Sequence, residues 1–106
     1  MNLDYAVEVS TDTMFPSGRT IVVSRFSSQT PGLQSTSQAP GHLQIDLSTT
    51  NTSLPLYIRQ AQTLYWRAGV RNHADRPGPV PDSIGERYIF SARYFTLNRP
   101  LVPPGG

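Results

Sequence analysis

The stretch Leu54–Ala68, LPLYIRQAQTLYWRA, decides between a fold with a helix and one made of strands alone. At about 100° per residue, its apolar side chains fall within about 60° of one direction, which is typical of an amphipathic helix. These side chains belong to Leu54, Tyr57, Ile58, Ala61, Leu64, Tyr65 and Ala68. Ser53 can cap the start of the helix and Gly69 can end it. The spacing therefore predicts a helix over about residues 54–68.

The alternative for this stretch is a strand, because Leu54, Leu56 and Ile58 also alternate along the chain, although over only three apolar positions. The two structures place Trp66 differently. On the helix, Trp66 points away from the apolar stripe and lies on the outer side with Arg59. A lone exposed Trp beside Arg is typical of an interface hot spot. On a strand, Trp66 is a core residue instead.

Four further stretches predict strands. Residues 3–10 alternate between apolar and polar side chains, which predicts a strand with one wet face. The β-branched stretch 19–26, RTIVVSRF, predicts the returning strand of an antiparallel pair. A shorter alternation predicts a third strand over residues 43–47. The stretch 87–97, RYIFSARYFTL, predicts a long aromatic strand, and because both of its faces are largely apolar, we expect both to be covered.

The order of these elements, three strands, a helix and a strand, indicates an α+β domain. We expect an antiparallel sheet of four to five strands, one helix over about residues 54–68, and an extended Pro-rich C-terminal tail. If residues 54–68 form a strand, the alternative is an all-β sandwich or barrel. The domain is expected to span residues 1–97 with a long loop over 27–41. The tail is expected to span residues 98–106, because its prolines exclude a helix.

Charge is unevenly distributed along the chain, which has nine Arg and no Lys. Residues 1–53 carry two Arg against four carboxylates, so 2 − 4 = −2, and residues 54–106 carry seven against three, so 7 − 3 = +4. The Arg guanidinium tolerates desolvation at an interface better than an ammonium does. The asymmetry suits oriented contact with other proteins or with copies of the same chain.

The residue types that carry catalysis occur in few usable patterns. Cysteine is absent, and neither His42 nor His73 stands in a set of metal ligands. Asp4 and Glu8 fall on the wet face of the first strand, where nothing provides the cleft that acid–base catalysis needs. No phosphate-binding loop or nucleophile motif occurs. We therefore expect a protein that is not an enzyme, with no metal, no cofactor and no small-molecule substrate.

The sequence also bears on where the chain is made. It has no apolar run long enough to span a membrane, and residues 1–4 lack the basic and apolar regions of a signal peptide. We expect synthesis in the cytoplasm, no membrane association, and incorporation into a virion or another particle.

Two short stretches suggest other functions. The stretch 87–97 combines Arg87 and Arg93 with aromatic side chains, which is the composition of a platform for stacking nucleic-acid bases. The net charge of only +2 and the lack of adjacent Arg argue against a nucleic-acid partner. The C-terminal stretch 103–106, PPGG, resembles the Gly-Gly end of ubiquitin-like modifiers, and this resemblance implies conjugation through the terminal glycine.

Composition favours a structural role over these alternatives. Only 37% of the residues are hydrophobic, below the usual level of about 45–50%, which leaves a thin core. We expect a structural subunit of a larger assembly that acts by protein–protein contacts, with a head-decoration, cement or connector protein of a virus or phage particle as the leading example. Its expected partners are other protein subunits, including copies of itself. The expected contact residues are Trp66, Arg59, Arg67, Arg71, Arg87, Arg93, Pro100, Pro103 and Pro104.

Overall fold

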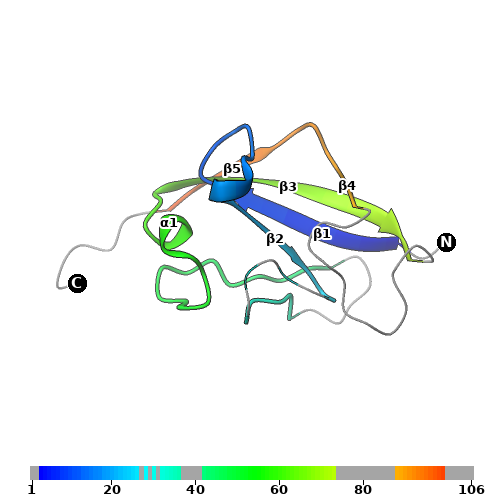
Figure 1. Ribbon diagram of the computed structural model, residues 1–106, viewed down its shortest axis with the longest axis horizontal. Helices are drawn as coiled ribbons and strands as arrows, with labels where there is room; N and C mark the ends of the chain where they lie inside the picture. Colours follow the sequence, from blue (N-terminus) through cyan, green and yellow to red (C-terminus); the bar gives the residue numbers. More distant parts are fainter. Residues whose placement is uncertain are drawn as a thin grey trace.

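The computed structural model describes residues 3–26, 28, 30, 32–36, 42–73 and 88–99. Its strands are β1 (Leu3–Ser10), β2 (Thr20–Ser24), β3 (Thr63–Asn72), β4 (Ile89–Phe90) and β5 (Phe95–Asn98), joined by the 3-10 turn η1 (Ser17–Arg19) and the helix α1 (Leu56–Arg59). All pairings are antiparallel, and the strands form one open sheet in the order β2-β1-β3-β4, with β5 also paired to β3 (Figure 1). The predicted antiparallel sheet of four to five strands is confirmed, and the sheet is open rather than closed into a barrel.

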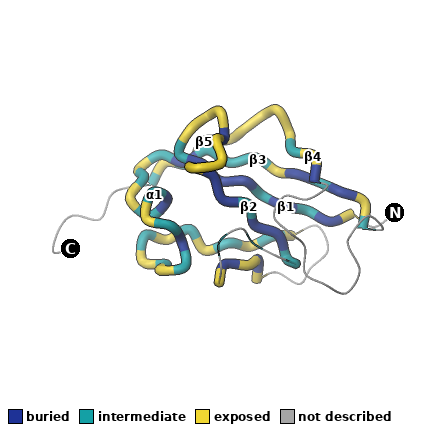
Figure 2. The backbone as a smooth tube through the Cα atoms, in the orientation of Figure 1, coloured by how far each residue is buried: buried dark blue, intermediate teal, exposed yellow. Residues whose placement is uncertain are grey.

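The hydrophobic core lies on one face of this sheet. Its buried side chains are Val9, Ile21, Val23, Leu33, Leu54, Ile58 and Leu64. Residues 42–61, which include α1, run across this face and supply part of the cover (Figure 1). Buried positions follow the middle of β1, β2 and β3, whereas the β1–β2 loop and the β4–β5 connection are largely exposed (Figure 2). The alternation in β1 predicted this face correctly for Val9, but Leu3 lies outside the cluster and is 41% exposed.

The helix predicted over residues 54–68 is wrong. The helix α1 spans only Leu56–Arg59, and β3 begins at Thr63. Leu54, Ile58 and Leu64 are all buried, so the apolar spacing identified core positions but not the backbone conformation. β3 contains the β-branched or aromatic residues Thr63, Tyr65, Trp66 and Val70. Its residues 65–72 pair with the whole of β1, from Leu3 to Ser10. That ladder supplies backbone hydrogen bonds and cross-strand contacts that outweigh the local helical preference.

The strand predicted over residues 43–47 is extended but has no named strand partner among the described residues. The expected alternation is present, because Leu43, Ile45 and Leu47 are half-buried and the residues between them are exposed. Ile45 and Leu47 pack against the core. Gln44 instead bonds to a segment that precedes it in the chain: its carbonyl accepts from the Thr36 N–H at 3.0 Å.

The strand predicted over residues 87–97 is interrupted. Gly69 is opposite Phe90, and Trp66 is opposite Phe95, so four residues of this segment face only two residues of β3. The Ser91 N–H donates to the Ala68 carbonyl at 2.9 Å. The two additional residues form a bulge between β4 and β5. Side chains alternate between the two faces of a strand, so an insertion of two residues leaves this alternation in step. The residues of β4 and β5 therefore lie on the faces that the sequence pattern predicted.

The close approach of Phe90 explains why a glycine occupies position 69. A Cβ atom on Gly69 would lie 2.6 Å from Cδ1 and 2.7 Å from Cε1 of Phe90. We expect Gly69→Ala to lower the free energy of unfolding by about 1–3 kcal/mol, because the ring has to move out of place. Urea denaturation measures this loss. Gly18→Ala is the control: nothing lies within 4 Å of its added Cβ, so a change below about 0.5 kcal/mol is expected. Equal losses in the two variants would contradict the prediction.

The C-terminal end of the described chain is part of the domain. Asn98 is the last residue of β5, and the Arg99 N–H donates to the Gln62 carbonyl at 2.9 Å. The Arg99 side chain donates to the Ala61 carbonyl at 2.9 Å and also to the carbonyls of Leu47 and Ile58. Residues 98 and 99 therefore belong to the fold rather than to a separate tail. The expected extended tail beyond them, and most of the loop expected over 27–41, lie outside the described residues.

Candidate functional site

Two ion pairs join β1 to β3 on the sheet face opposite the core. Asp4 is in register with Arg71 and Glu8 with Arg67. Arg71 Nε lies 3.1 Å from Asp4 Oδ2, with side chains 0% and 5% exposed. Arg67 Nε lies 2.9 Å from Glu8 Oε1, with side chains 26% and 10% exposed. The expectation that Asp4 and Glu8 lie on a wet face is therefore wrong, because β3 brings an arginine to each carboxylate.

Aromatic rings cover both arginines. The Arg71 guanidinium carbon lies 4.4 Å from the centre of the Tyr88 ring and 6.0 Å from that of Phe26. The same atom of Arg67 lies 4.2 Å from the Phe15 ring centre and 5.7 Å from that of Phe90. Each contact is a cation–π geometry. The rings also exclude water, and the lower local dielectric strengthens the attraction within each ion pair.

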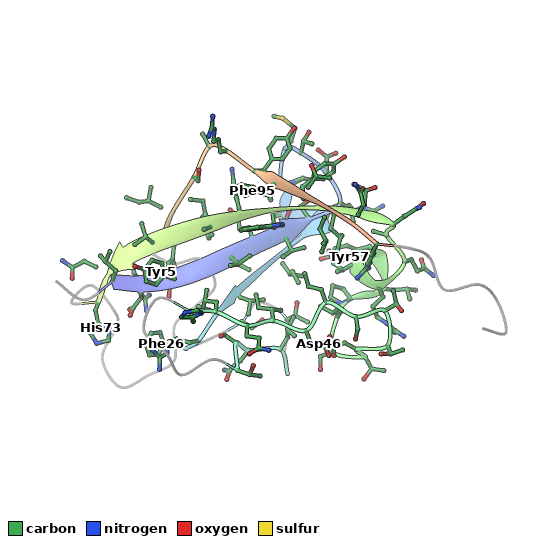
Figure 3. All side chains as sticks on the ribbon, turned by 180° about the vertical axis from the view of Figure 1, so that it is seen from behind. Tyr5, Phe26, Asp46, Tyr57, His73 and Phe95 are labelled. Atoms are coloured by element: carbon green, nitrogen blue, oxygen red, sulfur yellow. The ribbon has the colours of Figure 1, made fainter. Side chains whose placement is uncertain are left out.

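His73 extends the Asp4 pair at the end of β3. Its Nδ1 atom lies 2.8 Å from Asp4 Oδ1, and the side chains of His73 and Phe26 lie together at that end of the sheet (Figure 3). Both carboxylate oxygens of Asp4 are therefore engaged, one by Arg71 and one by His73. Asp4 therefore links the start of β1 to the end of β3 through both of its carboxylate oxygens. In the part of the chain that the structure describes, no group of three or more His, Cys, Asp or Glu is placed to hold a metal ion.

The two ion pairs reduce the difference in charge between the two halves of the chain. Four of the ionisable groups that distinguish the two halves neutralise each other inside the molecule. Without them, residues 1–53 retain two Arg against two Asp, so 2 − 2 = 0, and residues 54–106 retain five Arg against three carboxylates, so 5 − 3 = +2. The acidic first half is thus no longer acidic at its surface, whereas the second half keeps a positive charge.

Among the described residues, Asp46 and Arg99 have shifted pKa values, for structural reasons. Hydrogen bonds from the backbone N–H and the side chain of Ser48 lower the pKa of the Asp46 carboxyl. Burial lowers the pKa of the Arg99 guanidinium from its usual high value, and an arginine stays protonated at neutral pH even so. Both groups bind main-chain atoms of their own chain, which identifies them as parts of the scaffold.

Trp66 lies on β3 and not on the outer side of a helix. It is half-buried and packs against the core cluster. Its ring is stacked on that of Phe95, with centroids 4.6 Å apart and an angle of 24° between the planes. Of the two alternatives for Trp66, exposure on a helix is wrong, because residues 63–72 form a strand, and the strand alternative, which places Trp66 with the core, agrees with the structure. Phe95, which is 54% exposed, covers Trp66 and presents the surface that a partner would meet.

The exposed apolar side chains of the β4–β5 edge form the most prominent candidate site. Ile89 is 76% exposed, Phe95 54% and Tyr94 45%. Tyr94 also contacts the rings of Tyr65 and Phe15, at centroid distances of 5.5 and 6.3 Å. We call the surface formed by Ile89, Arg93, Tyr94 and Phe95 the aromatic edge. Of these four residues, only Arg93 was predicted from the sequence as a contact residue. The signal for the other three was the apolar character of both faces of residues 87–97, because the core of a small domain covers only one face of an edge strand.

The remaining expected contact residues are placed as follows. Arg59 ends α1, and its Nε donates to the Thr49 carbonyl at 3.2 Å. Arg93 is exposed in the bulge, and its N–H donates to Ser91 Oγ at 3.1 Å. Arg87, Pro100, Pro103 and Pro104 lie outside the described residues. The structure therefore brings Arg93 to the aromatic edge and places Arg67 and Arg71 in internal ion pairs.

Comparison with known proteins adds no relative. No protein family matches the chain, and no curated protein or solved structure is significantly similar to it. A search of the described residues for membrane spans finds no helix of sufficient length and apolarity.

Proposed function

We propose that the chain is a structural subunit of a larger protein assembly, with a virus or phage particle as the leading example, and that the aromatic edge is one of its contacts. The observation that carries this proposal is the exposure of Ile89, Tyr94 and Phe95 along one edge of the sheet. Exposed aromatic residues beside an arginine are the composition enriched at protein–protein interfaces.

The composition of the edge strands supports the same function. Natural proteins protect exposed edge strands from unwanted pairing with charged side chains or proline. β4 and β5 contain neither, since their sequences are IF and FTLN, and this edge is protected only by the short length of the two strands and the bulge between them. The exposed apolar side chains on this edge favour a chain that is covered by a neighbour in its working state.

The aromatic edge favours this role over the two alternatives. A nucleic-acid platform would need the rings of residues 87–97 to be available for base stacking. Tyr88 is buried against Arg71, and Phe90 packs over Gly69 and Arg67, so two of the rings already serve the fold. Conjugation as a modifier would act through Gly105 and Gly106, which lie outside the described residues.

Gradient sedimentation tests the proposed function. The epitope-tagged chain would be expressed in its producing cells and the lysate separated on a sucrose gradient. We expect the chain to sediment with a particle or complex far larger than its own 11.7 kDa and to be present there in a fixed ratio to the other subunits. Sedimentation of all of the chain as a free monomer would overturn the proposal.

Paired variants locate the contact. Phe95→Ser should reduce the amount of chain in the particle fraction at least tenfold, because interface aromatics often contribute about 2 kcal/mol or more to association. Leu56→Ser on α1 is the matched control, since Leu56 is 59% exposed and Phe95 54%. It should leave sedimentation unchanged. Urea denaturation of both purified variants separates lost contact from lost folding. Equal effects of the two variants on sedimentation would exclude the aromatic edge as the contact.

A further inference from the structure

The backbone of β5 has hydrogen-bonding groups that point away from the sheet. The Arg99 N–H donates to the Gln62 carbonyl, which makes these two residues a hydrogen-bonded pair of the β3–β5 ladder. In an antiparallel ladder such pairs alternate with pairs that direct their N–H and C=O groups outward. Thr96 and Asn98 belong to the outward set. Among the described residues, no strand lies on that side of β5.

The opposite edge of the sheet is already in use. Val23 of β2 forms an isolated antiparallel bridge with Ser28. The carbonyl of Ser24 accepts from the Ser35 N–H at 3.4 Å. The chain thus covers part of its β2 edge with its own residues. Within the described part of the chain, the edge formed by β4 and β5 has no such cover, and β5 is the longer of its two strands.

The charges near β5 indicate what kind of strand fits. Residues 88–99 contain Arg93 and Arg99 and no carboxylate. The exposed carboxylates of the described residues are Asp12 and Asp46, and both already accept backbone N–H groups, at 2.8 and 2.9 Å. Asp4 and Glu8 are buried in ion pairs. The described residues of a second copy therefore have little negative charge to offer to Arg93, whereas an acidic segment of another protein does.

We propose that β5 binds an extended acidic segment of a different protein, which adds to the sheet as a new strand beside Thr96 and Asn98. This inference rests on the proposed function and names the partner at the aromatic edge. The added strand takes main-chain hydrogen bonds from Thr96 and Asn98. Its apolar side chains pack beside Phe95, on the Trp66–Phe95 stack, and an acidic side chain pairs with Arg93.

A pair of variants at Thr96 tests the main-chain hydrogen bonds. Thr96→Pro removes the outward N–H and is compatible with an edge strand, because no bond to β3 is lost. Thr96→Val is the matched control, since it keeps the N–H and nearly the same shape. In the sedimentation assay, Thr96→Pro should reduce the chain in the particle fraction at least tenfold, and Thr96→Val should leave it unchanged. Circular dichroism and urea denaturation confirm that both variants fold. Equal sedimentation of the two folded variants would overturn strand addition.

A second pair tests the charge of the partner. Arg93→Glu should reduce the chain in the particle fraction at least tenfold by repelling an acidic segment, whereas Arg93→Lys keeps the positive charge and should preserve most of it. A loss that is equal in the two variants, or absent from both, would overturn an acidic partner.

Photo-cross-linking identifies the occupant directly. Phe95 is replaced by p-benzoylphenylalanine, the assembly is irradiated, and the cross-linked peptide is sequenced by mass spectrometry. We expect an acidic segment of another protein. A peptide from this same chain would overturn the inference in favour of a second copy. A basic or uncharged segment would also overturn it. These outcomes require the chain to be in an assembly, so they are distinct from free-monomer sedimentation, which overturns the proposed function itself.

Discussion

Arg71→Met is expected to lower the free energy of unfolding by about 3–5 kcal/mol. The Arg71 side chain is fully buried and Asp4 is 5% exposed, so the substitution leaves a carboxylate inside the protein that keeps His73 as its one side-chain partner among the described residues. Urea denaturation followed by circular dichroism measures the loss. A domain of this size is commonly stable by about 5–15 kcal/mol, so this loss is a large fraction of the free energy of unfolding.

The second ion pair provides the matched control for this result. Arg67 is 26% exposed, and water can solvate Glu8 once the guanidinium is removed. Arg67→Met should therefore cost roughly 1.5–3 kcal/mol, the range for a hydrogen bond to a charged group. The double variant Asp4→Leu with Arg71→Met should recover most of the loss, because no charge remains buried. A cost for Arg71→Met no greater than that for Arg67→Met would contradict the prediction.

Trp66→Ala is expected to lower the free energy of unfolding by about 3 kcal/mol, the lower end of the range for a buried tryptophan. The ring is half-buried, packs against the core and stacks on Phe95. Trp66→Phe keeps an aromatic ring in the stack and should cost clearly less. Urea denaturation again gives the values. A loss below about 1 kcal/mol in Trp66→Ala would show that the stack contributes little.

Fluorescence provides an independent readout because Trp66 is the only tryptophan. The isolated monomer should show emission that is partly protected from a neutral quencher such as acrylamide. Phe95→Ser should increase the quenching, since it removes the ring that covers Trp66. Emission as accessible as that of free tryptophan in the unmodified monomer would be inconsistent with this packing.

Local sequence patterns predicted β1 and β2 well. The alternation in residues 3–10 and the β-branched stretch at Thr20–Ser24 are signals contained within each strand. The burial of Asp4 and Glu8 could not be read from the same pattern, because their partners Arg71 and Arg67 lie 67 and 59 residues away along the chain. A carboxylate in an alternating strand is exposed or buried according to what the neighbouring strand brings to it.

Two of the errors in secondary structure, over residues 54–68 and 87–97, have a shared cause. Leu54, Ile58 and Leu64 suit the core at helical spacing, but the sheet required a partner for β1, and Thr63–Asn72 supplies it. In residues 87–97 the strand was predicted, but the bulge was not. The position of the bulge depends on where this segment pairs with β3, with Phe90 opposite Gly69 and Phe95 opposite Trp66. Both outcomes depend on long-range pairing, which the local spacing of apolar residues does not contain.

The candidate site was predicted in part for a similar reason. Arg93 was selected from composition, and the structure places it at the exposed bulge. The exposure of Ile89, Tyr94 and Phe95 depends on β4 and β5 being at the edge of the sheet, which follows from strand order and not from any residue within the stretch. Arg67 and Arg71 were selected for the same reason as Arg93, as arginines of the basic half of the chain. They lie on β3, which has a strand on each side, and so they are not at the edge.

During synthesis, β1 leaves the ribosome about fifty residues ahead of β3, which corresponds to several seconds at about 5–20 residues per second. In that interval β1 can pair only with β2, and its other edge is open to nascent neighbours. Asp4 and Glu8 are then solvated and charged, and their charge opposes such pairing. When Arg67 and Arg71 emerge, the same carboxylates become the internal anions that hold β1 against β3. The same two carboxylates are thus unpaired charges on an open strand before β3 is made and paired charges between the two strands afterwards.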